Sequence, residues 1–322
     1  MSAPLDTAVL KIADQEFRPG QHGTVELPTG QLPSGNAVNV TVHVFRGVRP
    51  GPTLLFMGGV HGDEINGVEI LRRCLRQKLF RHLSAGTVIC VPLLNVYGFN
   101  NYSRDVPDGK DVNRSFPGSQ SGSLASRIAY ALTKNILPHC DLVVDFHTGG
   151  RGVYNYPQIR YTPEDDRAQD AAAEFGPPLI VESKSPLKSL RRAAAKLEGG
   201  PAILTYEGGE NHRYDAYSIE TGVLGIRRLL NSRGLREQDV PPPPSPTVVL
   251  NSSWVRASRA GLFQWTKRSG FPVRKGEPIG FIADPQGIRA DKRVLSPRDG
   301  FIIGHNNTAV VSQGDALYNI GF

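Results

Sequence analysis

The feature of this sequence that most limits its fold is a regular alternation of short apolar runs with helix-patterned segments. The apolar runs are 53–60, 87–94, 141–147 and 202–207, and the helical patterns lie between or after them at about 64–79, 123–137, 164–175 and 218–230. Valines that alternate strictly over 38–44 add a half-buried strand. Strands that alternate with helices are typical of an α/β fold, so we expect a mixed, mostly parallel sheet flanked by helices.

Residue types that carry chemistry stand at the ends of three of these apolar runs. His61 and Glu64 follow the first run, His147 ends the third, and Glu207 ends the fourth. In open α/β sheets ligands bind outside the carboxyl ends of the strands. One crevice can therefore gather His61, His147 and Glu207, although they are far apart in the sequence.

His61, Glu64 and His147 are candidate metal ligands. Zinc favours mixed nitrogen and oxygen ligands, and a catalytic zinc uses three protein ligands plus a water molecule. Asp145 lies two residues before His147 on the same predicted strand, so it points the same way and can orient the imidazole. Taken singly, a glutamate at a helix start is usually just solvated. A preference for zinc over cobalt or manganese rests on ligand type.

Glu207 is a candidate general base. A carboxylate near a metal-activated water can take its proton and later deliver it to a leaving amine. The ordinary alternative is a carboxylate that caps the turn formed by the glycines that follow it.

Asn113 and Arg114 lie in the turn-rich motif Asp111-Val112-Asn113-Arg114-Ser115-Phe116-Pro117-Gly118. Together they offer a forked set of donors suited to a carboxylate, and Arg104, just upstream, could stabilise a developing oxyanion. Alternatively, these arginines could merely pair with Asp105, Asp108 or Asp111.

A proline-rich stretch, 241–246, suggests a boundary between two domains, 1–240 and 247–322. Beyond it the chain contains an internal repeat, in which 255–262 matches 294–301 and 273–279 matches 311–317. Two similar units of short strands and glycines predict a small C-terminal all-β barrel or sandwich with two-fold character.

The net charge of +7 invites a nucleic-acid interpretation, and the densest basic run is 71–82. At helical spacing its leucines form one stripe and its basic residues fall largely elsewhere, so we expect a solvated helix face and no nucleic-acid partner. A weaker alternative is that the positive charge attracts anionic substrates.

The three cysteines, Cys74, Cys90 and Cys140, show no CxxC spacing and each lies in an apolar or helical context. We expect buried, reduced thiols, which suits a reducing cytoplasm. The first residues lack the pattern of a signal peptide, and no apolar run approaches the roughly 20 residues that span a bilayer. These observations predict a soluble, cytoplasmic protein without a membrane partner.

Four motifs, in this order, resemble the succinylglutamate desuccinylase/aspartoacylase family, a branch of the zinc carboxypeptidase-like fold. They are His61-Gly62-Asp63-Glu64, the motif 111–118 given above, Asp145-Phe146-His147-Thr148-Gly149 and Glu207-Gly208-Gly209. The resemblance covers essentially the whole chain. The C-terminal region looks like the β-domain of many members, itself similar to lipoyl/biotinyl-type barrels.

The resemblance implies a role for each candidate residue. It implies one Zn²⁺ per subunit on His61, Glu64 and His147, with Glu207 as the catalytic carboxylate. It also implies that Asn113 and Arg114 hold the substrate carboxylate and that Arg104 assists at the scissile carbonyl. The segment Ser189-Leu190-Arg191 is similar to one that contributes a further substrate-side arginine; this would be Arg191, with Arg192 as the alternative.

Within the family, the chain looks more like the broad deacylase subgroup, which includes enzymes acting on N-acetylated diamino acids. The features that carry this resemblance are Asp63, the Asn-Arg-Ser-Phe-Pro-Gly form of the second motif and the β-domain. The activity implied is zinc-dependent hydrolysis of the amide bond of an N-acylated amino acid or related amine, releasing a small acyl group. Two other hypotheses stay open: a zinc carboxypeptidase acting on short peptides, and a carrier module modified at Lys292. The subunit count is also open, a homo-oligomer included.

Overall fold

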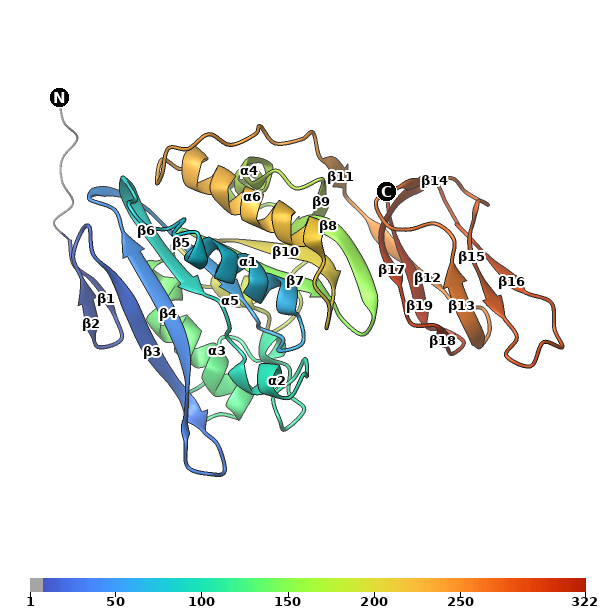
Figure 1. The fold of residues 1–322 in the computed structure, drawn as a ribbon, viewed down its shortest axis with the longest axis horizontal. Helices are drawn as coiled ribbons and strands as arrows, with labels where there is room; N and C mark the ends of the chain where they lie inside the picture. Colours follow the sequence, from blue (N-terminus) through green and yellow to red (C-terminus); the bar gives the residue numbers. More distant parts are fainter. Residues whose placement is uncertain (1–7) are drawn as a thin grey trace.

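The computed structural model describes residues 8–322 and has two parts, which lie side by side along its long axis (Figure 1). The α/β part (residues 8–250) contains the helices, and the C-terminal β part (residues 251–322) contains strands alone. The helices are α1 Ile65–Arg76, α2 Val96–Asn100, α3 Leu124–Asn135, α4 Asp166–Phe175, α5 Leu190–Ala194 and α6 Ala216–Ser232, with 3-10 turns at Val112–Arg114 and Leu137–His139.

The strands of the α/β part are β1 Leu10–Ile12, β2 Gln15–Phe17, β3 His22–Gln31, β4 Ala37–Arg46, β5 Arg49–Gly58, β6 Ala85–Val91, β7 Leu142–Gly149, β8 Val153–Tyr161, β9 Leu179–Glu182, β10 Ala202–Glu210 and β11 Thr247–Val249. Those of the C-terminal β part are β12 Ser252–Arg256, β13 Gly261–Trp265, β14 Pro272–Val273, β15 Pro278–Ala283, β16 Lys292–Leu295, β17 Gly300–Asn306, β18 Val310–Val311 and β19 Ala316–Gly321.

The central sheet is mixed, as the sequence predicts. Its strand order is β12-β19-β17-β8-β10-β7-β5-β6-β4-β3. The middle strands β10, β7, β5 and β6 are parallel, and they are the four apolar runs read from the sequence. Antiparallel strands flank this parallel core, β8 on one side and β4 and β3 on the other.

Helices cover both faces of the sheet, so the central strands are buried on two sides (Figure 1). Leu55 and Met57 of β5 belong to the hydrophobic cluster that includes α3 and α5. Leu54 and Phe56, which alternate with them, belong to the cluster that includes α1, α4 and α6. This two-sided burial explains why these strands appear in the sequence as continuous apolar runs rather than as alternating patterns.

Strand β8, which contributes Asn155 and Arg160 to the cavity described below, was not predicted from the sequence. Pro157 interrupts this strand, and a proline usually argues against a strand in the interior of a sheet because it cannot donate to the ladder. The register between β8 and β10 shifts at this point, between the pairs Asn155–Gly209 and Gln158–Glu207. The irregularity accommodates the proline.

The C-terminal β part is an antiparallel sandwich, as predicted. A four-stranded sheet, β16-β15-β13-β18, faces the strands β12, β19 and β17, and a separate hydrophobic cluster fills the space between them. β17 pairs with β8, so the central sheet continues from one part of the molecule into the other. β11, just beyond the proline-rich stretch, pairs with β9 of the α/β part. The division into domains at 240–247 stays a prediction.

Three smaller expectations concern the cysteines, Lys292 and membrane-spanning segments. Cys74, Cys90 and Cys140 are free and buried, which confirms the prediction of unpaired buried thiols. Lys292, which a carrier domain would present at a hairpin tip, is instead the first residue of β16 and pairs with Ile282 in the ladder. Among the helices of residues 8–322, none combines the length and the hydrophobicity that crossing a membrane requires.

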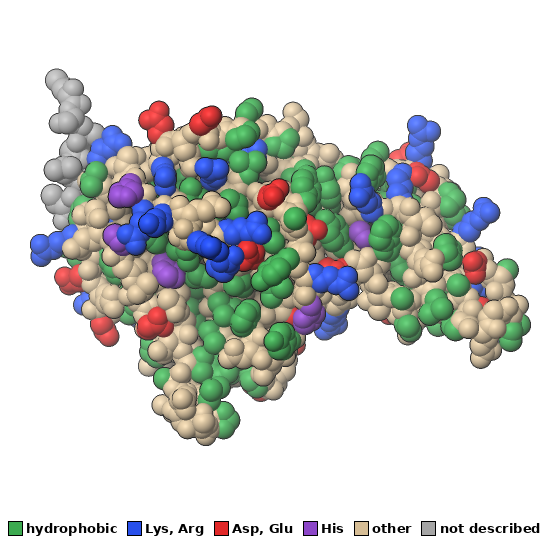
Figure 2. All heavy atoms as spheres, in the orientation of Figure 1, with side chains coloured by type: hydrophobic (Ala, Val, Ile, Leu, Met, Phe, Trp, Pro, Cys, Tyr) green, Lys and Arg blue, Asp and Glu red, His purple; other side chains and the backbone are tan. Residues whose placement is uncertain are grey.

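The basic run 71–82 forms a solvated face, as expected from its spacing. Leu71 and Leu79 are buried, while the side chains of Arg72 and Arg73 on α1 are 53% and 39% exposed. Figure 2 shows Lys and Arg side chains gathered over this region. Both guanidiniums contact the buried carboxylate of Glu69, at 2.6 and 2.8 Å. The hydrogen bond from Arg72 is the main cause that lowers the pKa of Glu69 to about 2.

Replacing Glu69 with Gln should lower the free energy of unfolding by about 1–2 kcal/mol at pH 7, a value reduced to allow for the exposure of both arginines. The pKa of Glu69 is lower in the folded than in the unfolded chain, so its stabilisation is complete above about pH 4.5 and is lost as the pH falls toward about 2. Urea unfolding at pH 7 and pH 4 measures the difference between variant and parent.

The matched control is Glu220→Gln, an exposed glutamate on α6. It should change the unfolding free energy by no more than a few tenths of a kcal/mol at either pH. An equal effect of the two substitutions at pH 7, or a Glu69→Gln effect that grows as the pH falls, would contradict this account.

Candidate metal centre and its cavity

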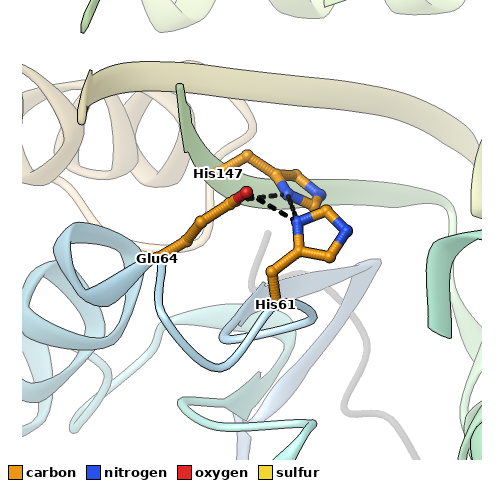
Figure 3. Close-up of side chains that lie close together, drawn as sticks. All are labelled: His61, Glu64 and His147. Carbon is orange, nitrogen blue, oxygen red and sulfur yellow. Dashed lines mark hydrogen bonds and ion pairs between the residues drawn. The ribbon is translucent and has the colours of Figure 1, made fainter. Parts of the chain in front are cut away.

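The three predicted metal ligands converge. His61 and Glu64 lie in the turn between β5 and α1, and His147 lies on β7; all three are at most 3% exposed. Figure 3 shows their side chains pointing toward one another. One oxygen of Glu64 lies 2.7 Å from Nδ1 of His61, the other lies 2.9 Å from Nδ1 of His147, and the two Nδ1 atoms are 3.1 Å apart.

A carboxylate holds the far side of each imidazole. Asp145 accepts a hydrogen bond from Nε2 of His147 at 2.8 Å, and Asp111 contacts Nε2 of His61 at 3.3 Å. With the proton on Nε2, each neutral ring presents its Nδ1 lone pair to the same point. Two imidazole nitrogens and one carboxylate, all within 4.8 Å of one another, are a donor set suited to a divalent transition metal.

The three residues stabilise one another's charges. Burial acts to lower the pKa of both histidines, but Glu64 and the two aspartates outweigh it and raise the pKa of His61 and of His147. The pKa of Glu64 lies well below its usual range despite its burial, because the two imidazoles stabilise its charge. The site therefore holds a carboxylate whose negative charge needs cationic partners.

A close backbone approach fixes the turn that carries His61 and Glu64. A Cβ on Gly62 would lie 1.9 Å from the carbonyl carbon of Gly98 on α2, so only glycine allows the turn to lie this close to the helix. From the other side, the backbone N–H of Thr148 donates to Glu64 at 3.1 Å. The position of the carboxylate is thus set by both neighbouring elements.

Arg104 lies beside the three ligands. It donates to Glu64 at 3.1 Å and, through two nitrogens, to Asp111 at 3.2 and 2.9 Å. The local pairing with Asp111 that the sequence left open is therefore real, and Arg104 faces the ligands at the same time. Asp111 itself, which contacts both His61 and Arg104, was not among the predicted site residues. Its place at the start of the motif 111–118 was the available signal.

Glu207 is the cross-strand neighbour of His147, because β10 and β7 are parallel and in register at this pair. Asn155 on β8 donates to one carboxylate oxygen of Glu207 at 2.9 Å. Asn155 was not predicted, since β8 was not recognised as a strand.

One cavity of about 320 Å³ is lined by all the residues that the sequence singled out for the site. They are His61, Glu64, Arg104, Asn113, Arg114, Asp145, His147, Arg191 and Glu207. Other lining residues were not predicted, among them Asn155 and Arg160 of β8, and Trp254 of the C-terminal β part.

The cavity is also lined by cationic side chains. Arg191 is buried and lines the cavity, while Arg192 is exposed and does not line it. Arg191 donates to the backbone oxygen and the hydroxyl of Ser183, each at 3.1 Å. Burial and the neighbouring charge of Arg160 lower the pKa of Arg191 to about 10.

Three guanidinium groups of this cavity lack an acidic partner. Within residues 8–322, no carboxylate lies within 4 Å of Arg114, Arg160 or Arg191. Asn113 accepts a hydrogen bond from the backbone N–H of Leu190 at 3.0 Å, which leaves its amide N–H groups free to donate. Unpaired cations and free donors in one cavity are suited to an anionic ligand such as a carboxylate.

Comparison with known proteins gives this geometry a context. The sequence model of one protein family, the succinylglutamate desuccinylase/aspartoacylase catalytic domain, matches residues 50–233 of this chain. The chain is 32% identical over 311 residues to the N-alpha-acetyl-L-2,4-diaminobutyric acid deacetylase of Halomonas elongata. The alignment covers 92% of this chain and 90% of that protein.

Solved structures agree with these matches. A succinylglutamate desuccinylase/aspartoacylase from Rhodobacter sphaeroides superposes with a TM-score of 0.80 at 28% identity, over 94% of this chain and 95% of that one. The product-bound ectoine utilization protein EutE (DoeB) from Ruegeria pomeroyi gives a TM-score of 0.83 at 24% identity, over 100% and 99% of the two chains, and so shares the fold. The chain belongs to the succinylglutamate desuccinylase/aspartoacylase family.

Proposed function

We propose that this protein is a zinc-dependent amide hydrolase that removes a small acyl group, such as acetyl or succinyl, from an N-acylated amino acid or related amine. The observation that carries the proposal is the convergence of His61, Glu64 and His147 beside Glu207, in a cavity that several arginines also line. The Halomonas elongata relative, by its name a deacetylase of an N-acetylated diamino acid, supports the same reaction class.

His61, Glu64 and His147 would hold one zinc ion per subunit. When bound, the ion would polarise the scissile carbonyl and lower the pKa of a water molecule. Asp145 and Asp111 would keep the two imidazoles in the tautomer that offers Nδ1 to the ion.

Glu207 would handle the protons of the reaction. Asn155 donates to one of its carboxylate oxygens, which leaves the other to accept a proton from the attacking water. The same oxygen would then deliver that proton to the amide nitrogen as the C–N bond breaks. The amine leaves neutral and the acyl group leaves as a carboxylic acid, so the hydrolysis balances with one water consumed.

Arg104 would stabilise negative charge on the carbonyl oxygen. Its bonds to Glu64 and Asp111 occupy three of its five N–H groups and fix the plane of the guanidinium. The two remaining N–H groups can meet the oxyanion without rearrangement, which is the condition for effective electrostatic stabilisation. Asn113, Arg114 and Arg191 would bind the carboxylate of the substrate.

We further propose how the chain is divided into domains and where the protein is located. Residues 1–240 would form the catalytic domain and 247–322 the β-domain, and Trp254 would let the latter close one side of the cavity. The three free thiols suit a cytoplasmic location.

A substrate panel tests the proposal against the carboxypeptidase alternative. Purified protein with its native metal should release amine from N-acetyl or N-succinyl amino acids, and incubation with a chelator should abolish the release until zinc is restored. Short unblocked peptides should be hydrolysed at least about tenfold more slowly, as kcat/KM. Faster cleavage of the peptides would favour a carboxypeptidase, and full activity after metal removal would refute the metal-dependent mechanism.

Glu207→Gln tests the assignment of the base. The amide keeps the size of the side chain but cannot accept the proton, so kcat should fall by about 10²–10⁴-fold while the bound metal stays at the parental level. Metal analysis and single-turnover assays measure the two quantities. Glu220→Gln is the control and should leave both unchanged. A Glu207→Gln variant with the parental rate would remove this residue from the mechanism.

A further inference from the structure

A second cavity, of about 580 Å³, lies where the α/β part meets the C-terminal β part. β8 and the start of α6 form one side, and the loop after β13 together with β17 forms the other. Its lining residues are Tyr154, Tyr156, Asp215, Tyr217, Trp265, Arg268, Ser269, Gly270, Phe271, His305 and Asn307. None of them lines the first cavity, that of the proposed active site, which is called the catalytic cavity below.

The two cavities lie on opposite faces of β8. Tyr154 and Tyr156 line the second cavity, whereas Asn155, between them, lines the catalytic cavity and donates to Glu207. Successive side chains of a strand point to opposite faces, so this division follows from the strand itself. The second cavity is therefore separate from the first, on the other face of β8, whose Asn155 donates to the proposed base Glu207 of β10.

Aromatic rings form most of its wall. The rings of Tyr156 and Tyr217 are 5.8 Å apart, and Trp265 meets His305 edge-on at 4.8 Å. Tyr217, Trp265 and Phe271 are 48%, 41% and 42% exposed, so three large rings keep much of their surface in solvent around one hollow. Exposed aromatic surface gathered in a concave site is typical of ligand-binding surfaces.

The charges of the wall leave one cation without compensation. The guanidinium of Arg268 lies 5.2 Å from the centre of the Phe271 ring, and no carboxylate among residues 8–322 lies within 4 Å of it. Asp215, the acidic residue of the wall, accepts a hydrogen bond at 2.7 Å from Ser218 and caps α6, whose N-terminal dipole stabilises its charge.

His305 adds no charge to the cavity. Its Nδ1 accepts a hydrogen bond from the backbone N–H of Ser269 at 3.2 Å, so the ring proton is on Nε2 and the imidazole is neutral. Burial, which lowers the pKa of His305 to about 4, has the same consequence.

We propose that this cavity binds a small planar organic anion, of the chemical class of the aromatic carboxylates. The ring of the ligand would lie against Tyr154, Tyr217 and Trp265, and its carboxylate would pair with Arg268. A cationic ligand, which an aromatic wall can also attract, is disfavoured because Arg268 already occupies the site with a positive charge.

The tryptophan content of the chain allows a direct test. The protein has two tryptophans, Trp254 in the catalytic cavity and Trp265 in the second. In the full-length variant Trp254→Phe, tryptophan fluorescence therefore reports on the second cavity alone. The fluorescence is excited at the long-wavelength edge of the tryptophan absorption band. Addition of benzoate to this variant should change the fluorescence of Trp265 saturably. Benzamide has the same ring without the charge, and acetate has the charge without the ring; each should bind at least about tenfold more weakly.

Two further substitutions in the Trp254→Phe background complete the test. Arg268→Met should weaken benzoate binding by at least about tenfold, and the matched control Arg293→Met, at an exposed arginine of β16, should leave it unchanged. Circular dichroism verifies that each variant is folded. No saturable response to benzoate, equal affinity for benzamide, or an Arg268→Met variant that binds benzoate as tightly as its parent would each overturn the proposal. These outcomes do not depend on whether the catalytic cavity is a deacylase.

Discussion

The structure depends on one electrostatic constraint: two imidazole Nδ1 atoms and a carboxylate are held at one buried point. Nδ1 of His61 and Nδ1 of His147 are 3.1 Å apart with Glu64 between them, and an aspartate on the far side of each ring fixes its orientation. Buried polar groups that face each other in this way are costly unless a partner satisfies them all. A divalent cation is such a partner, and the surrounding fold is organised to keep the three groups in place.

The sheet provides that organisation. β5 and β7 are adjacent and parallel, so the residues that follow or end them meet at one edge of the sheet. β10 adds Glu207 opposite His147 in exact cross-strand pairing, and β8 adds the asparagine that holds Glu207. β17 continues the sheet into the C-terminal β part, from which Trp254 reaches the catalytic cavity. The C-terminal β part is thus joined to the site through the backbone ladder.

The parts of this picture that could be predicted from the sequence have strong local signals. Buried parallel strands appear as apolar runs, and the histidines and glutamates at their ends stand out against them. The fold class and the predicted metal ligands followed from this, whereas Arg191 was predicted from the family resemblance alone. Asn155 and Arg160 were missed because they lie on β8, where Pro157 and alternating polar residues hide the strand. Trp254 was missed because its place depends on how two distant parts of the chain pack, which no local pattern encodes.

The measurement that tests the central claim most directly is X-ray absorption at the zinc edge of the purified protein, combined with a crystal structure phased at the same edge. The account predicts one zinc per subunit, with Nδ1 of His61, Nδ1 of His147 and an oxygen of Glu64 at about 2.0–2.2 Å. A metal held by other side chains, or a fully active protein with no metal at this point, would contradict it.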